Sequence, residues 1–155
     1  MREIKGDLFE FRGQGNIIII PTNGKYRYGS QIAIMGAGVA KQAAKVWPGL
    51  PQMLGRELAQ HGNVVRRFAI KSALGEELVW TFPTKDNWAD DSKLGLIDKS
   101  AEALMRHLDE MPETHTVYLP RVGCGLGNLR WEDVEKVLRR HLDSRFVVVH
   151  KNSDE

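Results

Sequence analysis

The sequence is poor in several features that would point to particular classes of protein. Its 155 residues include one cysteine, which excludes an intrachain disulfide and any structural zinc site built on two or more cysteines. The longest apolar run, Ile32–Ala40 with its two glycines, is far shorter than the ~20 residues of a membrane-spanning helix. The formal net charge of +2 is too small by itself to indicate a nucleic-acid-binding protein.

The ends and composition of the sequence indicate a single soluble domain. The segment Met1–Asp7 is charged and has no apolar stretch of the kind found in signal peptides. Together with the lone cysteine, this predicts a cytoplasmic protein that does not contact a membrane. Hydrophobic residues make up 42% of the chain and charged residues 27%, as is typical of globular domains. We expect one domain over residues 1–150 and a polar tail over residues 151–155.

Strand patterns alternate with helix patterns along the chain. Four consecutive isoleucines, Ile17–Ile20, predict a strand buried on both faces, as parallel strands are. In Leu94–Leu108 apolar residues recur at spacings of three and four, which predicts a helix with Ser92 as its N-cap. The same criteria predict strands over Arg2–Lys5, Phe68–Leu74, Leu78–Phe82, Val117–Leu119 and Phe146–Val149, a turn at Gly75-Glu76, and helices over Val39–Trp47, Gln52–His61 and Trp131–Leu142. Helices that follow strands indicate an α/β sheet covered on both faces.

Two glycine-rich loops precede predicted helices. They are Met35–Ala40 (MGAGVA) and Gly123–Gly127 (GCGLG). Glycine lacks the Cβ atom that keeps a backbone away from a ligand, and a helix N-terminus favours an anion. If the chain had a single loop of this kind, close packing alone would explain its glycines. Two of them, beyond the carboxyl ends of strands where α/β sheets bind ligands, fit a ligand with two linked phosphates.

Neither loop matches the common nucleotide-binding motifs. The dinucleotide fingerprint requires a third glycine where this chain has Lys41, and the second loop has the spacing G-x-G-x-G. A P-loop requires serine or threonine after Gly-Lys, but Gly24-Lys25 is followed by Tyr26. A kinase, an ATPase or an NAD-dependent dehydrogenase is therefore not expected. The histidines show no metal-ligand spacing, so we expect neither a metal site nor a cofactor.

Several segments together resemble the macro domain, a family that binds ADP-ribose. They are Gly6-Asp7, the hydrophobic strand that leads to Asn23, and the two glycine loops, so the resemblance covers nearly the whole chain. Two further segments are similar to the branch that contains terminal ADP-ribose glycohydrolases and the DNA ADP-ribosyl glycohydrolase antitoxin of the DarT–DarG pair: Phe82-Pro83-Thr84-Lys85 with Trp88, and Pro120–Trp131. The family implies a single three-layer α/β/α domain around a mixed, largely parallel sheet.

The resemblance also implies a role for each residue of the predicted site. Lys85 corresponds to the lysine on which this branch relies for catalysis, and Asp7 to the acceptor for the exocyclic amine of adenine. Asn23 is expected near the distal ribose. Independently of the resemblance, His150 is a further candidate near adenine, because it ends the last predicted strand. The remaining predicted ligand contacts are Leu8, Gly36, Gly38, Val39, Ala40, Thr84, Trp88, Gly123, Cys124, Gly125, Leu126 and Gly127.

The chain departs from the family pattern in two places. Some relatives have an acidic residue, which helps to resolve a lysine adduct, where this chain has Gly127; the DNA-directed relatives have glycine there. The segment Gly24–Ile34 is longer than the pattern predicts, so the resemblance does not define the rim of the distal-ribose pocket.

Most of these residues also have a purely structural interpretation. Lys85 follows a predicted strand, where lysines are commonly solvated surface charges. Asp7 can cap a turn after Gly6. Cys124 can be a small buried filler rather than a thiol nucleophile. Trp88 can cover the lysine, stack on a modified base, or form an exposed lid. The pairs Arg66-Arg67 and Arg139-Arg140 are typical of solvated faces rather than of DNA contacts.

The resemblance implies a chain that binds ADP-ribose and hydrolyses the link at C1″ in ADP-ribosylated nucleic acid, or in modified protein side chains. Lys85 would attack C1″ or would stabilise an oxocarbenium-like centre, and the sequence leaves both routes open. Two alternatives remain: a non-catalytic reader of ADP-ribose, and a phosphatase that acts on ADP-ribose 1″-phosphate. A cognate ADP-ribosyltransferase toxin is a candidate partner.

Overall fold

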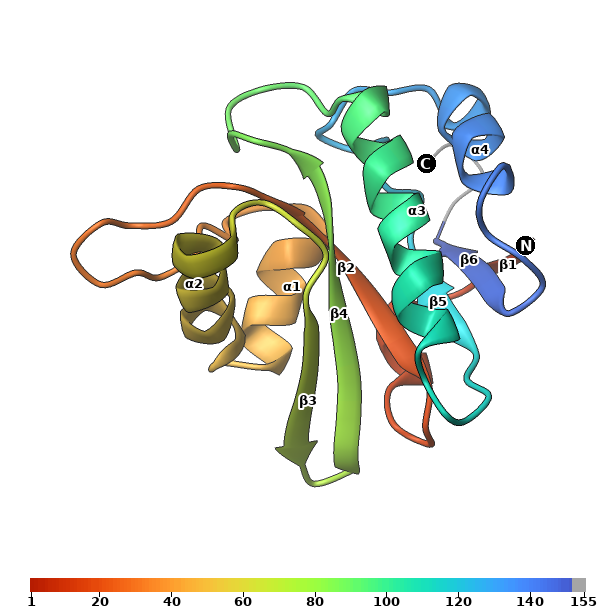
Figure 1. Cartoon of the computed structure of the whole chain (residues 1–155), viewed down its shortest axis with the longest axis horizontal. Helices are drawn as coiled ribbons and strands as arrows, with labels where there is room; N and C mark the ends of the chain where they lie inside the picture. Colours follow the sequence, from red (N-terminus) through yellow and green to blue (C-terminus); the bar gives the residue numbers. More distant parts are fainter. Residues whose placement is uncertain (152–155) are drawn as a thin grey trace.

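Six strands form one sheet with helices on both faces (Figure 1). The computed structural model describes residues 1–151. The strands are β1 (Arg2–Lys5), β2 (Ile17–Asn23), β3 (Arg67–Ser72), β4 (Gly75–Lys85), β5 (Val117–Leu119) and β6 (Phe146–His150). Their order is β1-β6-β5-β2-β4-β3, and all neighbours are parallel except the antiparallel pair β3 and β4. The expected mixed, largely parallel sheet is confirmed.

The sheet separates two core layers, and helices cover each of them. The helices are named in chain order. They are the 3₁₀ helix η1 (Leu8–Phe11), α1 (Gly38–Val46), α2 (Leu50–His61), α3 (Leu94–Asp109) and α4 (Trp131–Arg139). Helices α1 and α2 pack on one face of the sheet, and α3 and α4 pack on the other (Figure 1). This is the three-layer α/β/α arrangement that the resemblance implies.

The four isoleucines of β2 join both layers. Successive side chains of a strand point to opposite faces. Accordingly, Ile17 and Ile19 pack with α3 and α4, whereas Ile18 and Ile20 pack with α1 and α2. All four are at most 1% exposed, so the strand is buried on both faces as expected.

Two predicted boundaries on the β3–β4 hairpin are wrong. The turn lies at Ala73-Leu74 rather than at Gly75-Glu76, because Ser72 pairs with Gly75 across the hairpin and Gly75 begins β4. Gly75 has φ of +88°, a left-handed conformation that glycine adopts without steric cost. At its other end, β4 continues past Phe82 to Lys85.

The helix ends also differ from expectation. Lys93 is the N-cap of α3, without a side-chain cap bond, whereas Ser92 is buried and its backbone N–H donates to the Gly127 carbonyl. Ser92 therefore belongs to a loop–loop contact. Helix α4 ends at Arg139, although Leu142 remains buried after it. The 3₁₀ helix η1 (Leu8–Phe11) was not predicted, because four residues are too few to show a helical period.

The last two features of the chain are its C-terminal tail and its lack of a membrane-spanning helix within residues 1–151. Of the expected tail, residues 152–155 lie outside the described residues. Among residues 1–151, none of the helices combines the length and the apolar character needed to cross a membrane.

Candidate functional site

The predicted site residues lie beyond the carboxyl ends of parallel strands. Strand β2 ends at Asn23 and pairs with β4, so that Asn23 is the register partner of Lys85. The register shifts between Thr22 and Asn23, which marks an irregularity at this edge. The loops that follow β1, β2, β4 and β5 therefore leave the same edge of the sheet, where ligands of open α/β sheets bind.

A cavity of about 220 Å³ lies beside η1 and the start of α1. It brings together four residues of the predicted ligand set from two distant segments: Asp7 and Leu8 from the chain after β1, and Gly38 and Val39 from the first turn of α1. Gly38 has φ of +56°, so the turn that opens α1 uses the left-handed conformation. Gly6, Gln42, Pro120, Val149 and Lys151 complete the lining.

Asp7 has a structural role in this cavity wall. Its Oδ1 accepts a hydrogen bond of 3.0 Å from the Phe9 backbone N–H, which makes Asp7 the N-cap of η1. The capping interpretation is therefore confirmed, while the adenine contact stays a prediction. His150 lies nearby, because the Gly6 backbone N–H donates to the His150 carbonyl at 2.9 Å.

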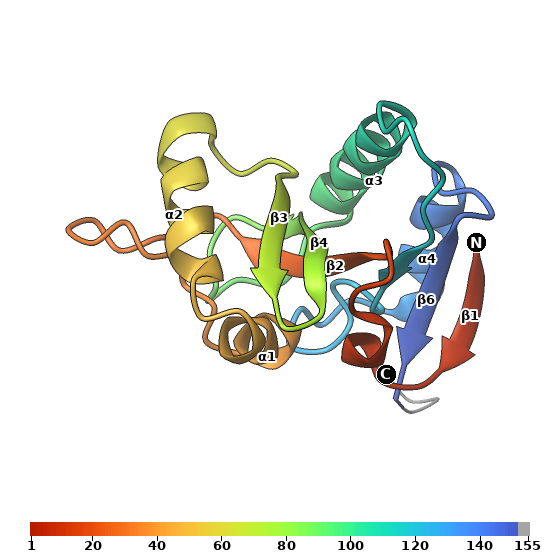
Figure 2. The same ribbon diagram turned by 90° about the horizontal axis from the view of Figure 1, so that it is seen from below.

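Asn23 holds both ends of the long 24–34 segment. Its Nδ2 donates to the Ile34 carbonyl at 2.9 Å, and its Oδ1 accepts from the Lys25 backbone N–H at 2.8 Å. Between these points the segment folds back on itself through a bridge of Tyr26 and Ala33. It projects past α2 in both views (Figures 1 and 2) and contacts that helix at Gly55, where a Cβ atom would collide with the Gln31 carbonyl.

Lys85 is partly exposed at the end of β4. Its Nζ donates to the Asp90 backbone carbonyl at 3.1 Å, so the side chain lies against the loop that leads to α3. Its own backbone carbonyl accepts from Asn63 Nδ2 at 3.0 Å, and the preceding Thr84 is buried. The main chain at Lys85 is thus fixed, while Nζ is held by one neutral acceptor. Trp88, in the same loop, is 58% exposed.

The second glycine loop, residues 123–127, is tied to the segment before α3. The Ser92 backbone N–H donates to the Gly127 carbonyl at 3.0 Å, and Asn128 Nδ2 donates to Asp91 Oδ1 at 2.7 Å. Since residues 86–92 connect Lys85 to α3, these bonds bring the predicted diphosphate loop beside the segment that follows the predicted catalytic lysine. Leu126 at the tip of the loop is 69% exposed.

The loop has no room for a side chain at Gly127. A Cβ atom there would lie 2.5 Å from the Gly123 carbonyl and would collide with Ser92 Oγ. At Gly125, by contrast, a Cβ atom would meet nothing within 4 Å. An acidic residue at position 127 therefore requires a different loop conformation.

We expect Gly127→Asp to lower the free energy of unfolding by about 1–3 kcal/mol, the usual cost of overpacking. Urea unfolding measures this effect. Gly125→Asp is the matched control, because its Cβ points into open space, and it should change stability far less. Equal unfolding midpoints for the two variants would contradict this description of the loop.

Cys124 behaves as a packing residue. Burial raises the pKa of Cys124 to about 11, against a smaller lowering by Arg121. Its Sγ lies 3.4 Å from the Val122 carbonyl. A thiol with this pKa is almost entirely protonated near neutral pH, which argues against a thiolate nucleophile. Among residues 1–151, no group of three or more His, Cys, Asp or Glu side chains could hold a metal ion.

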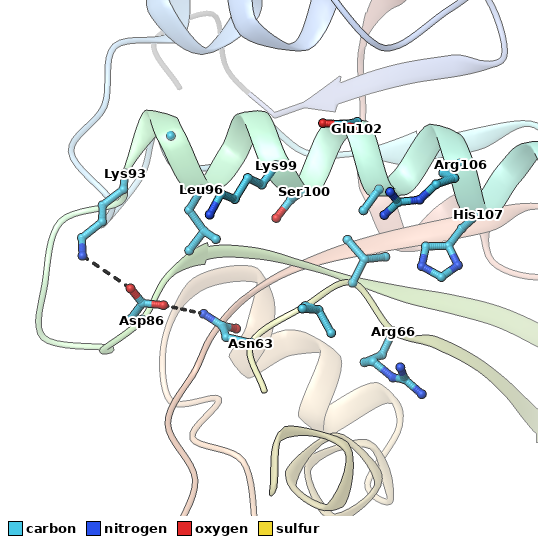
Figure 3. A pocket seen from close by; sticks show the side chains of 14 residues that line it. Asn63, Arg66, Asp86, Lys93, Leu96, Lys99, Ser100, Glu102, Arg106 and His107 are labelled. Carbon is cyan, nitrogen blue, oxygen red and sulfur yellow. Dashed lines mark hydrogen bonds and ion pairs between the residues drawn. The ribbon is translucent and has the colours of Figure 1, made fainter. Parts of the chain in front are cut away.

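A larger groove of about 900 Å³ lies outside the predicted site (Figure 3). It runs between α3 and residues 63–66 and contains none of the predicted ligand contacts. It nevertheless reaches the site, because Asp86 in its wall is the residue after Lys85. Sequence reasoning missed it. The available signal was the pair Lys99 and Arg106, seven residues apart on one face of α3.

Comparisons with known proteins agree with this architecture. No family model matches the sequence. A protein of Mycobacterium tuberculosis named DNA ADP-ribosyl glycohydrolase is 29% identical over 130 residues, which cover 81% of this chain and 36% of the relative. A Thermus aquaticus protein of the same name is 22% identical over 134 residues, 84% of this chain and 37% of the relative. The chain thus spans little more than a third of the length of the curated relatives it matches.

Solved structures share the fold over nearly the whole chain. The macrodomain of Mycobacterium tuberculosis DarG has a TM-score of 0.77 at 24% identity and covers 97% of both chains. A Thermosipho africanus DarTG structure in complex with ADP-ribose has a TM-score of 0.80 at 18% identity, over 99% of this chain and 42% of that one. Its sheet order, its two helical layers and these structural neighbours show that the chain has the macrodomain fold.

Proposed function

We propose that this macrodomain binds ADP-ribose and hydrolyses the glycosidic link at C1″ that joins it to a modified nucleic acid. Modified protein side chains are the second class of conjugate. The observation that carries the proposal is the strand register that places Lys85 beside Asn23, at the edge of the sheet beyond which the loops after β2 and β5 lie. The relatives named DNA ADP-ribosyl glycohydrolase support the reaction and the substrate class.

In the proposed complex the ligand extends along this edge. Adenosine would occupy the 220 Å³ cavity, with Asp7 as the acceptor for the adenine amine. The diphosphate would meet backbone N–H groups at the N-terminus of α1, where the helix dipole favours an anion, and those of the 123–127 loop. The distal ribose would then lie near Asn23 and Lys85.

The proposed reaction breaks the bond between C1″ and the base and adds water across it. The proton of the water goes to the departing nucleobase, and its oxygen becomes the new hydroxyl group on C1″. Lys85 either attacks C1″ and is then displaced by water, or it stabilises the oxocarbenium-like centre and moves the proton. Binding along the whole ligand would fix C1″ against Nζ, an orientation effect worth several kcal/mol.

The proposed unit is residues 1–150. We further propose a cytoplasmic location and an ADP-ribosyltransferase of the DarT type as partner. The second point is supported by the name of the Thermosipho africanus DarTG structure.

The direct test compares three labelled substrates: ADP-ribosylated DNA, ADP-ribosylated RNA and ADP-ribosylated protein. We expect the nucleic acids to lose label faster than the protein. Retention of label on all three, together with binding of free ADP-ribose, would instead identify a reader. Release of phosphate from ADP-ribose 1″-phosphate, with all three conjugates intact, would identify the phosphatase.

Binding itself gives a separate prediction at Asp7. We expect roughly micromolar affinity for ADP-ribose, about −8 kcal/mol, and much weaker binding of AMP or ribose 5-phosphate. Asp7→Ala should cost about 1–3 kcal/mol of this, because a charge-assisted hydrogen bond is lost. Calorimetry measures both values.

The matched control is Asp7→Asn, since asparagine caps a helix as well as aspartate does. It should keep the melting temperature of the wild type but not its affinity, which separates the cap from the ligand contact. Absence of heat with ADP-ribose at hundreds of micromolar would contradict the binding assignment.

A further inference from the structure

The groove beside α3 carries an excess of positive charge. Figure 3 shows its two walls: one is α3, and the other is the stretch of chain that leads into β3. Four cationic side chains line it, against two carboxylates: Arg66, Lys93, Lys99 and Arg106 against Asp86 and Glu102. A repeating anionic polymer is the class of ligand that such a charged groove attracts.

Two of these cations have no ion-pair partner among residues 1–151. Lys93 lies 3.4 Å from Asp86, and Arg66 Nη2 lies 2.8 Å from Glu57. Lys99 and Arg106 form no such pair within the described part of the chain, and both are exposed. Seven residues apart, they share one face of α3 and stand about 10 Å apart along its axis.

Buried polar atoms in the groove also lack partners. Within the described residues, Asn63 Oδ1, Arg66 Nε and His107 Nδ1 are shielded from solvent and make no hydrogen bond. Burial and the charge of Arg67 lower the pKa of His107, which keeps its ring neutral near pH 7. Because these atoms have almost no accessible surface, they belong to the packed wall beneath the groove rather than to its ligand-facing surface.

The groove leads to the predicted catalytic lysine. Asn63 Nδ2 donates to the Lys85 carbonyl at 3.0 Å and to Asp86 Oδ1 at 3.1 Å, so one side chain joins the groove wall to the end of β4. Val64, 47% exposed, adds an apolar surface on the same wall. A polymer bound in the groove would therefore contact the wall at Asp86, the residue that follows Lys85.

We propose that this groove binds the single-stranded polynucleotide that flanks the ADP-ribosylated base. Its phosphates pair with Lys99 and Arg106, and its bases lie against the exposed Val64 on the opposite wall. A single strand presents such a base without the cost of flipping it out of a duplex, so the groove is assigned to a single strand. This inference rests on the proposed function for its substrate class, but the groove's affinity for DNA can be measured without any reaction.

The binding test uses a fluorescein-labelled single-stranded DNA of about ten nucleotides that carries no ADP-ribose. This length lies within the usual site size of single-strand-binding domains. We compare Lys99→Ala/Arg106→Ala with Lys45→Ala/Arg56→Ala. The control pair consists of an exposed lysine and an exposed arginine on α1 and α2, across the sheet. Alanine suits helices, so all four substitutions preserve the fold, and melting temperatures verify this.

We expect the groove variant to bind the DNA roughly tenfold more weakly at low salt. The plot of log association constant against log salt concentration should become less steep by about 1.4, which is about 0.7 for each lost phosphate contact with a single strand. The control pair should match the wild type in both quantities. Equal affinity and equal slope for both double variants would overturn the groove assignment.

A second measurement separates the groove from the reaction. On an ADP-ribosylated oligonucleotide the groove variant should show a raised KM and an unchanged kcat, whereas on ADP-ribosyl thymidine it should match the wild type. If the wild type releases ADP-ribose from neither substrate, the proposed function is wrong. The fluorescence anisotropy of the labelled DNA still shows whether the groove binds a single strand. If the groove variant loses binding to an acidic peptide but still binds DNA as the wild type does, the groove is a protein-binding site and the proposal is wrong.

Discussion

Replacing Lys85 with alanine is expected to abolish release of ADP-ribose from modified DNA and to change the affinity for free ADP-ribose only a few-fold. Lys85 leaves the sheet from β4, whereas the glycine loops precede α1 and follow β5. Its loss therefore removes the reacting group without removing the proposed diphosphate contacts. Single-turnover release of ADP-ribose measures the first effect, and calorimetry measures the second.

Two variants sharpen this prediction. Lys85→Arg should not restore activity, because a guanidinium does not deprotonate to act as a nucleophile and has a different shape. Lys71→Ala removes an exposed lysine from β3 and should leave activity unchanged. If Lys85→Ala retains full activity, the enzyme stands but the assignment of its lysine is wrong.

Arg12→Ala is expected to lower the free energy of unfolding by about 3 kcal/mol, because it leaves a buried carboxylate without its cation. Glu77 is 1% exposed and accepts two hydrogen bonds of 2.8 Å from Arg12 and one of 3.1 Å from Trp47 Nε1. Arg12 directly follows η1 and Trp47 directly follows α1, so this cluster joins both walls of the small cavity to β4. Urea unfolding measures the loss.

The same cluster predicts a pH dependence. Burial by itself would raise the pKa of Glu77, but hydrogen bonds from Arg12, Ser72 and Trp47 outweigh it and lower this pKa below the ordinary value. The contribution of Glu77 to stability is therefore complete above the pKa of the unfolded chain and is lost as the pH falls through the folded pKa.

The control for this cluster is the double variant Arg12→Ala/Glu77→Leu, which removes both charges. It should be more stable than Arg12→Ala alone and should lack the Glu77 part of the acid dependence. If Arg12→Ala unfolds at the urea concentration of the wild type, the pair is not a structural anchor.

Elements with a clear period could be predicted from the sequence. The apolar spacing of α3 and the isoleucine run of β2 are long or pure enough to fix both the element and its buried faces. The β3–β4 turn could not be located, because the pairing of Ser72 with Gly75 sets it rather than local turn residues. Ser92 is a good N-cap type, but contact with the Gly127 loop decides its place.

The candidate site divides in the same way. Lys85, Asp7 and the glycine loops came from contiguous motifs. The cap made by Asp7 was one of two interpretations that the sequence allowed, whereas the two hydrogen bonds by which Asn23 holds the 24–34 segment emerge only with the backbone geometry. The groove joins α3 to residues 63–66, about thirty positions earlier, and no local pattern relates segments that meet only in the folded chain.

The identity of the products shows whether the protein hydrolyses the bond at C1″. The wild-type protein is mixed with an oligonucleotide that carries one ADP-ribose on a thymine or guanine base, and the products are separated and weighed by mass spectrometry. Hydrolysis at C1″ predicts equal amounts of intact ADP-ribose and unmodified oligonucleotide, with no reaction when Lys85 is alanine. Unchanged substrate, or AMP together with an oligonucleotide that keeps a ribose phosphate, would rule out hydrolysis at C1″.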